Sequence, residues 1–251
     1  MRGVPSRRPG YRRLVPGELA RRRRLATAAR WPLGVGLTSW QYLWRTTPMR
    51  RKEEAGEAAS NTAPPLPGGV ASEELQTHDG GSGPLLHRVY RVTIANATSS
   101  AAEVMQRMQA NPDCVSPSEF AQFIKVAGAE MEMCAGDEFV VRMPGPWDGP
   151  VRVIDVTPTS FRFATLKGHL EAGQIEFRAH DGQPLQFEIE SWARSGDRFS
   201  AFLFDRLPMA KEVQLHMWIC VLERVVKLAA GERSGPLEVY TRRVEMADRD
   251  A

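Results

Sequence analysis

The feature that most constrains this fold is a series of short alternating segments followed by one long apolar helix. Between residues 137 and 192, apolar and polar side chains alternate, and Gly, Pro or Asp ends each segment. This pattern predicts at least five antiparallel strands. Residues 209–229 then predict a helix roughly 30 Å long. Its apolar residues recur at helical spacing: Leu215, Ile219, Leu222 and Val226.

Three elements are predicted before this series. Residues 86–94 are rich in strand-favouring residues and predict a first strand. A helix is expected next, capped by Thr98 or Ser99 and running to about Ala110. Ser116 and the proline that follows it predict the start of a second short helix. The expected order is therefore a strand, two short helices, the antiparallel strands and the long helix.

This order predicts an α+β fold in which the sheet wraps around the terminal helix. A twisted antiparallel sheet has to cover its apolar face, and residues 209–229 form the only predicted element long enough to do so. Where the helix and the sheet diverge, we expect a partly apolar cavity of the kind that binds small ligands.

Charge divides the chain into two parts. Residues 1–52 contain 14 basic residues and one acidic residue, whereas residues 53–251 contain 19 basic and 29 acidic residues. Composition predicts four parts: a basic, aromatic-containing N-terminal extension over 1–52, a disordered linker over 53–83, the folded domain over 84–232 and a C-terminal tail over 233–251.

The extension has two interpretations. Its run Arg21, Arg22, Arg23 and Arg24, with tryptophans further on, suits an anionic surface, either a membrane or a nucleic acid. Alternatively, it is a solvated leader or a misassigned start, because blocks of like charge are usually solvated. It satisfies the pattern of neither a signal peptide nor a membrane span.

Several kinds of chemistry are not predicted. The three cysteines form no disulfide framework or metal knuckle, and no two of the five histidines have the spacing of ligands on one helical face. We therefore expect no metal and no cofactor, and a reducing compartment, which favours a cytoplasmic protein that is possibly peripheral to a membrane. Serine-hydrolase and dinucleotide-binding motifs are also missing.

The predicted order and its closing helix resemble the helix-grip fold of the START-like (SRPBCC) superfamily. That superfamily includes polyketide cyclases, lipid-transfer domains and plant pathogenesis-related proteins. Residues 83–230 are most similar to a bacterial family in it that is known as a domain of unknown function. A T-L-x-G-H-x-E-x-G stretch carries much of the likeness: Thr165, Leu166, Gly168, His169, Glu171 and Gly173. The resemblance implies the fold and assigns no catalytic residue.

His169 and Glu171 are the candidates for polar chemistry. On an extended segment, side chains two residues apart point the same way, so the two could act as a general acid–base pair or anchor a ligand. The alternative is that His169 caps a turn and Glu171 is solvated.

The other candidate ligand-binding residues are one threonine and three tryptophans: Thr165, Trp147, Trp192 and Trp218. The tryptophans could wall a pocket with their apolar faces, although such residues more often belong to a core. Arg142 and Arg162 could bind a carboxylate, but alternation places both on the solvated face of the sheet.

These observations favour a module that binds a small apolar or amphipathic molecule. Two alternatives stay open: a cyclase- or hydratase-type enzyme in which His169 and Glu171 move protons, and a scaffold with a filled core and no ligand. Fold analogy alone is a weak argument for function.

Overall fold

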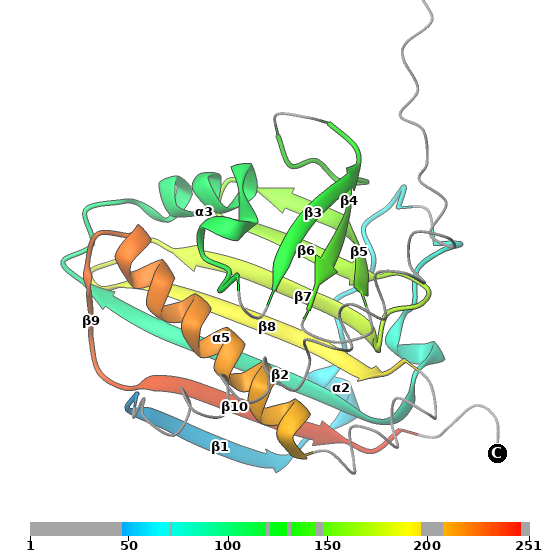
Figure 1. Cartoon of the computed structure of the whole chain (residues 1–251). Helices are drawn as coiled ribbons and strands as arrows, with labels where there is room; N and C mark the ends of the chain where they lie inside the picture. The colour runs from blue at the N-terminus through cyan, green and yellow to red at the C-terminus, as the bar shows by residue number, and fades with distance from the viewer. Residues whose placement is uncertain are drawn as a thin grey trace, which may run out of the picture.

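The computed structural model describes residues 47–70, 72–118, 121–129, 132–143, 148–196 and 208–246. Their main feature is a ten-stranded sheet (Figure 1). The strands are β1 (Met49–Ala55), β2 (Ser82–Ala95), β3 (Gln122–Ala127), β4 (Glu138–Arg142), β5 (Asp148–Thr157), β6 (Ser160–Thr165), β7 (Glu171–His180), β8 (Leu185–Ser195), β9 (Glu232–Arg233) and β10 (Leu237–Val244). The helices are α2 (Ala58–Asn61), α3 (Ala101–Ala110) and α5 (Pro208–Leu228), with 3-10 turns η1 (His78–Gly80) and η2 (Pro112–Cys114).

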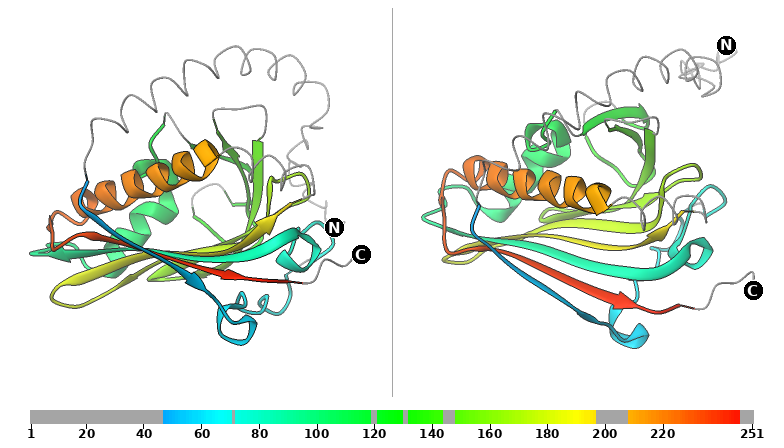
Figure 2. Two further views of the ribbon diagram at one scale, coloured as in Figure 1. Left: turned by 90° about the horizontal axis from the view of Figure 1, so that it is seen from below. Right: turned by 60° about the horizontal axis from the view of Figure 1, so that its bottom comes forward.

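The sheet has the order β1-β10-β2-β8-β7-β6-β5-β4-β3, and β9 pairs with β2 off this path. Strands β3 to β8 form an antiparallel meander, and β2 closes it by pairing with β8. Figure 2 shows α5 and α3 on one face of the sheet and the β3–β4 end curling toward them. The α+β helix-grip architecture expected from the sequence is therefore confirmed.

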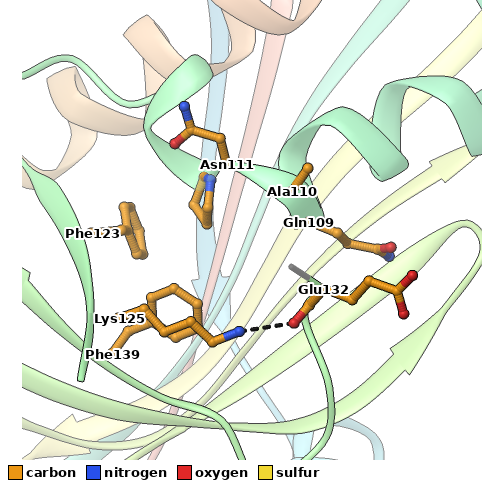
Figure 3. A pocket seen from close by; sticks show the side chains of 8 residues that line it. Gln109, Ala110, Asn111, Phe123, Lys125, Glu132 and Phe139 are labelled. Atoms are coloured by element: carbon orange, nitrogen blue, oxygen red, sulfur yellow. Dashed lines mark hydrogen bonds between the residues drawn. The ribbon is translucent and has the colours of Figure 1, made fainter. Parts of the chain in front are cut away.

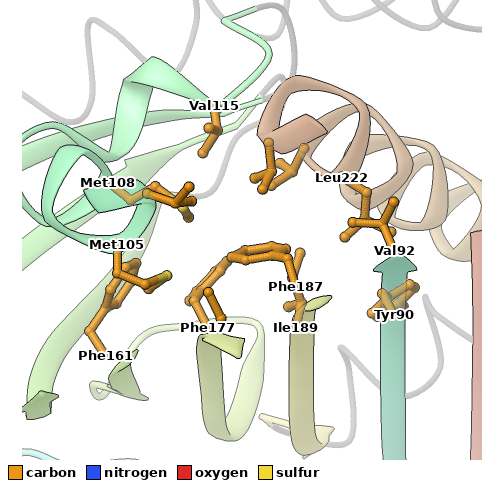
Figure 4. Packing of buried hydrophobic residues seen from close by; sticks show 14 of the residues in the cluster. Tyr90, Val92, Met105, Met108, Val115, Phe161, Phe177, Phe187, Ile189 and Leu222 are labelled. Atoms are coloured by element: carbon orange, nitrogen blue, oxygen red, sulfur yellow. The ribbon is translucent and has the colours of Figure 1, made fainter. Parts of the chain in front are cut away.

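The inner face, which faces α3 and α5, carries the main hydrophobic core (Figure 4). Alternation along β6 and β7 points Phe161, Phe163 and Phe177 inward, where their rings pack at centroid distances of 4.9–6.2 Å. From α5, Leu215, Ile219 and Leu222 join them as predicted. Burying aromatic side chains of this size supplies much of the free energy that holds a helix on a sheet.

The outer face is covered as well, by the segment that leads from β1 to β2. Leu66, Val70 and Leu75 pack against Ile154, Ala164 and Leu166, whose side chains point away from the core. This differs from the disordered linker expected over residues 53–83. The physical reason is that β5 and β6 are apolar on both faces, so the outer face also gains free energy from being covered.

The two terminal segments extend the sheet beyond the predicted domain boundaries. β10, inside the expected tail of 233–251, pairs antiparallel with β2, and β1 pairs with β10 in parallel. β1 is rich in charged residues and lies at the edge of the sheet. Backbone hydrogen bonds to a neighbour, rather than an apolar face, decide that this segment forms a strand, so no alternation marks it.

Two local predictions change near α3. Its cap is Ser100, not Thr98 or Ser99, and Glu103 completes a capping box with it. η2 lies before the expected start of the second helix at Ser116. Of that helix, the described residues show one turn, in which the N–H of Ala121 donates to the carbonyl of Pro117 at 2.9 Å, and Phe123 already lies in β3, where it pairs with Val141 of β4. From Gln122 onward, pairing along the sheet outweighs the local preference for a helix.

The end of α5 is a Schellman motif. The N–H of Gly231 donates to the carbonyl of Val226, and the N–H of Ala230 donates to the carbonyl of Lys227. Ala230, rather than the glycine that follows it, takes the left-handed conformation, with φ at 49°. Gly231 is needed for space, because a Cβ there would lie 2.6 Å from the side chain of Ile94.

Candidate functional site

The T-L-x-G-H-x-E-x-G stretch builds the corner between β6 and β7. Gln76, from the segment on the outer face, holds this corner: its side-chain amide donates to the carbonyl of His169 at 2.9 Å and accepts from the N–H of Gly168 at 3.2 Å. The Thr165 hydroxyl donates to the carbonyl of Gln76 at 2.8 Å and accepts from the N–H of Gly173 at 2.9 Å. Most of this stretch therefore shapes a turn.

His169 takes part in the same turn. Its Nδ1 accepts a hydrogen bond from the backbone N–H of Glu171 at 2.9 Å. Nδ1 also lies 3.1 Å from the carbonyl oxygen of Glu171, so both of its contacts are with the Glu171 backbone, and Nε2 packs beside Gly149. Burial lowers the pKa of His169, which the Glu171 carboxylate only partly opposes. The structure thus places His169 as a neutral cap of the corner, one of the two roles considered from the sequence.

The carboxylate of Glu171 is directed elsewhere, toward α5. It accepts from Nε2 of Gln214 at 3.2 Å and lies 3.7 Å from Nη1 of Arg88, on β2. Arg88 in turn donates to Oε1 of Gln214 at 3.0 Å. His169 and Glu171 are therefore neighbours in sequence, but the carboxylate and the imidazole ring have different partners.

We call Arg88, Glu171 and Gln214 the inner polar cluster. The residue-by-residue alternation of β2 and β7 places it on the inner face, next to the apolar core, and the Arg88 residue is 9% exposed. Small residues surround it on the sheet: Ser191 pairs with Arg88, and Gly173 lies two residues beyond Glu171. Isolated charges are costly to bury, so a cluster of this kind is a strong functional candidate.

Tyr90 connects the inner polar cluster to the core. It follows Arg88 on the same face of β2, and its ring centroid lies 6.3 Å from that of Trp218 in α5. Burial raises the pKa of the Tyr90 hydroxyl; the nearby Arg88 opposes this rise and Glu171 adds to it. The phenol is therefore protonated at neutral pH and is available as a hydrogen-bond donor.

Sequence reasoning did not select Arg88 or Gln214. A signal was present in both cases. Arg88 lies two residues before Tyr90 and four before Val92, so strand alternation points all three side chains inward. Gln214 lies four residues before Trp218 on α5, about one helical turn away. A polar residue in an apolar periodic series marks a buried polar group.

Of the predicted tryptophans, Trp192 and Trp218 lie on opposite faces of the sheet. Trp218 contacts the core, with its ring 5.8 Å from that of Phe177. Trp192 lies on the outer face, packed with Ala63 and Leu85, because its neighbours at odd positions of β8 point inward. It cannot wall an inner pocket from there. Trp147 lies outside the described residues.

The two candidate arginines differ in exposure. Arg142 is exposed, as alternation predicted, whereas Arg162 is on the outer face but only 7% exposed. The burial of Arg162 differs from the solvated position that alternation predicted. The nearest carboxylate to Arg162 is Asp155, at 3.7 Å.

A pocket of about 180 Å³ opens between α3, η2 and the β3–β4 hairpin (Figure 3). Phe123 and Phe139 belong to its wall and also contact the core. Nζ of Lys125 crosses it to the carbonyl of Glu132 at 2.8 Å and pairs with the buried carboxylate of Asp137 at 2.6 Å. The lysine charge is thus already neutralised, and we regard the inner polar cluster as the stronger candidate.

Within the described ranges, no group of three or more His, Cys, Asp or Glu side chains is placed to hold a metal ion. None of the helices in the same ranges is both long and apolar enough to cross a membrane.

Comparisons with known proteins add a likeness of fold. No family model and no curated protein matches the chain. The chain is similar to the di-domain ARO/CYC protein StfQ of the steffimycin biosynthetic pathway, at 10% identity and a TM-score of 0.44, over 59% of this chain and 51% of that one. It thus spans about half the length of that structure.

Two plant proteins are similar at the same level. Norcoclaurine synthase from Thalictrum flavum has 12% identity and a TM-score of 0.39, over 59% of this chain and 96% of that one. Major latex-like protein 151 from Panax ginseng has 12% identity and a TM-score of 0.41, over 57% and 97%. The helix-grip assignment rests on the strand order and α5, and the resemblance to the bacterial family of unknown function stays a prediction.

Proposed function

We propose that this protein binds a small amphipathic molecule with an anionic head between α5 and the inner face of the sheet. Arg88 carries the proposal. Among the described residues, Gln214 is its one hydrogen-bond acceptor, and its carboxylate neighbour, Glu171, is 3.7 Å away. A guanidinium has five N–H donors arranged to hold a carboxylate or phosphate in a fork, so most of its donors are left for a ligand.

The surroundings of Arg88 suit the two ends of such a molecule. An anionic head would lie against the guanidinium, within reach of the Tyr90 hydroxyl. The chain or ring would lie toward the aromatic core that begins at Tyr90 and Trp218. Sites of this kind are mostly apolar and use a few polar groups to orient the ligand.

The other functions considered from the sequence have less support. Proton transfer by a His169–Glu171 pair requires the two side chains to act together, but Nδ1 of His169 is used by a backbone N–H. Contact with an anionic surface would depend on Arg21–Arg24, which lie outside the described residues, so that interaction stays a prediction from charge.

Dodecanoate and dodecanol test the proposal, because they share an apolar chain and differ in the anionic head. We expect dodecanoate to raise the melting temperature of the full chain more than dodecanol does. Arg88→Gln should remove this difference, and Arg88→Lys should reduce it, because lysine keeps the charge but loses the fork. Arg142→Gln, an exposed arginine on β4, is the matched control and should leave the difference intact.

Native mass spectrometry of the purified protein provides an independent measurement. A co-purifying mass that is displaced by dodecanoate would support binding. If no mass co-purifies and neither probe changes the melting temperature, the proposal is wrong and the scaffold alternative is favoured. Chemical conversion of a co-purified molecule would favour the enzyme alternative.

A further inference from the structure

A buried histidine on the outer face joins the covering segment to the sheet. His87, in β2, is 6% exposed, and its Nδ1 lies 2.8 Å from Oδ1 of Asn61, the last residue of α2. The orientation of the Asn61 amide is fixed by its own contacts. Nδ2 donates to the carbonyl of Glu57 at 2.8 Å, so the oxygen, not the nitrogen, faces the histidine.

The other ring nitrogen also meets an acceptor. Nε2 of His87 lies 2.7 Å from Oε1 of Glu190, on β8. Burial raises the pKa of Glu190, but the hydrogen bond from His87 and the charge of Arg178 outweigh it, so the pKa is held below its ordinary value. Glu190 is therefore an ionised acceptor near neutral pH.

A neutral imidazole carries only one N–H, so it could satisfy one of these oxygens and would turn a lone pair toward the other. We infer that His87 is an imidazolium in the folded protein and donates from both nitrogens, so that it links Asn61 of α2 to Glu190 of the sheet. We call this pair of hydrogen bonds the clasp. Loss of one ring proton would break one of the two hydrogen bonds and release α2 from β2.

The groups around the ring support a positive charge. Trp192 stacks on it, with ring centroids 5.3 Å apart and an interplanar angle of 11°, an arrangement that favours a cation over the indole. Two arginines face the same region, but both are paired. Arg242, opposite His87 on β10, bonds to Glu54 of β1, and Arg178 of β7 is shared between Glu188 and Glu190.

The clasp sets the direction in which the stability of α2 on the sheet depends on pH. The protonated ring contributes its full hydrogen bonding at low pH, and this contribution is lost as rising pH removes the proton. Hydrogen bonds that involve a charged group are stronger than those between neutral groups. The equilibrium constant for local opening of residues 57–63 should therefore increase about tenfold when the proton is lost.

Side-chain nitrogen NMR on the full chain tests the inference directly. We expect both ring nitrogens of His87 to have the chemical shift of protonated nitrogens at pH 7, with the signal assigned by its loss in His87→Gln. The exposed His180 is the internal reference. A singly protonated His87 ring at pH 7 would overturn the inference, whatever the variants do.

Hydrogen exchange then tests the clasp. Amides of 57–63 should lose protection as the pH is raised, beyond the intrinsic rate change, whereas those of β7 should not. Asn61→Asp, which offers an ionised acceptor, should move this loss to higher pH, and Asn61→Ala should remove the protection at every pH. Protection of 57–63 that stays parallel to that of β7 would show that the proton does not hold α2.

Discussion

Nε2 of Gln214 lies 3.2 Å from both carboxylate oxygens of Glu171, which connects the first half of α5 to the start of β7. The same glutamine accepts from Arg88 of β2. One side chain of the long helix thus contacts the carboxylate of β7 and the guanidinium of β2. The polar contacts position the part of α5 that precedes its apolar contacts with the core.

Glu171→Gln tests the energetic role of this contact. The variant keeps a hydrogen-bond acceptor for Gln214 but leaves the buried Arg88 without a carboxylate. We expect a loss of about 1–2 kcal/mol in the free energy of unfolding, less than for a fully buried pair, because the Glu171 side chain is 22% exposed. Urea unfolding measures it, with Glu245→Gln, at an exposed glutamate, as the control. Equal losses in both variants would contradict the expectation.

His169 predicts part of the acid sensitivity. Because burial lowers its pKa in the folded state, the unfolded chain binds a proton first as pH falls below about 6.5. The stabilising contribution is therefore complete above that pH and declines below it. His169→Gln can still accept from the N–H of Glu171 but cannot titrate. Urea unfolding at pH 7 and pH 5 should show a smaller loss for the variant; identical losses would argue against this role.

Gly173 is required by a close approach of β7 to β8. A Cβ at this position would lie 1.9 Å from the carbonyl oxygen of Trp192, so the backbone itself would have to move. We expect Gly173→Ala to lower the free energy of unfolding by about 2–3 kcal/mol. Gly68→Ala is the control, because nothing lies within 4 Å of its Cβ position. Chemical denaturation of both variants distinguishes a steric effect from a general cost of replacing glycine.

Ala230 offers a stabilising substitution. A residue with a Cβ is strained at a φ of 49°, and glycine removes that strain at the end of α5. We expect Ala230→Gly to raise the free energy of unfolding by about 0.5–1 kcal/mol. Ala230→Val should have the opposite effect, because a β-branched side chain is more strained there. Thermal unfolding measures both, and a destabilising Ala230→Gly would refute the assignment of the cap.

The basic extension gives a prediction that depends on charge alone. Replacing Arg21, Arg22, Arg23 and Arg24 by glutamine should weaken salt-sensitive binding to anionic vesicles or nucleic acid, if the extension contacts such a surface. Sedimentation with vesicles that contain anionic lipid, at low and high salt, measures it. Unchanged binding would favour the solvated-leader interpretation.

The candidate site was only partly predictable. The T-L-x-G-H-x-E-x-G stretch identified Glu171 and the corner around it, and capping of the turn was one of the two roles open for His169. It did not indicate that the Glu171 carboxylate would turn to α5. Arg88 and Gln214 are 126 residues apart in the chain, and only the packing of α5 over β2 brings them together. Local patterns carry no information about such a contact, even where each residue interrupts an apolar series.

The amino-acid order alone determined the meander of strands, the inward direction of Phe161, Phe163 and Phe177, and the long closing helix, because periods of 2 and 3.6 residues are local properties of the backbone. Only the tertiary structure decided that a segment resembling a linker covers the outer face, that β1 and β10 extend the sheet, and that Trp192 and Glu171 face opposite ways. These outcomes depend on which surfaces are left for a segment to bury once the sheet has formed, and that is a property of the whole molecule.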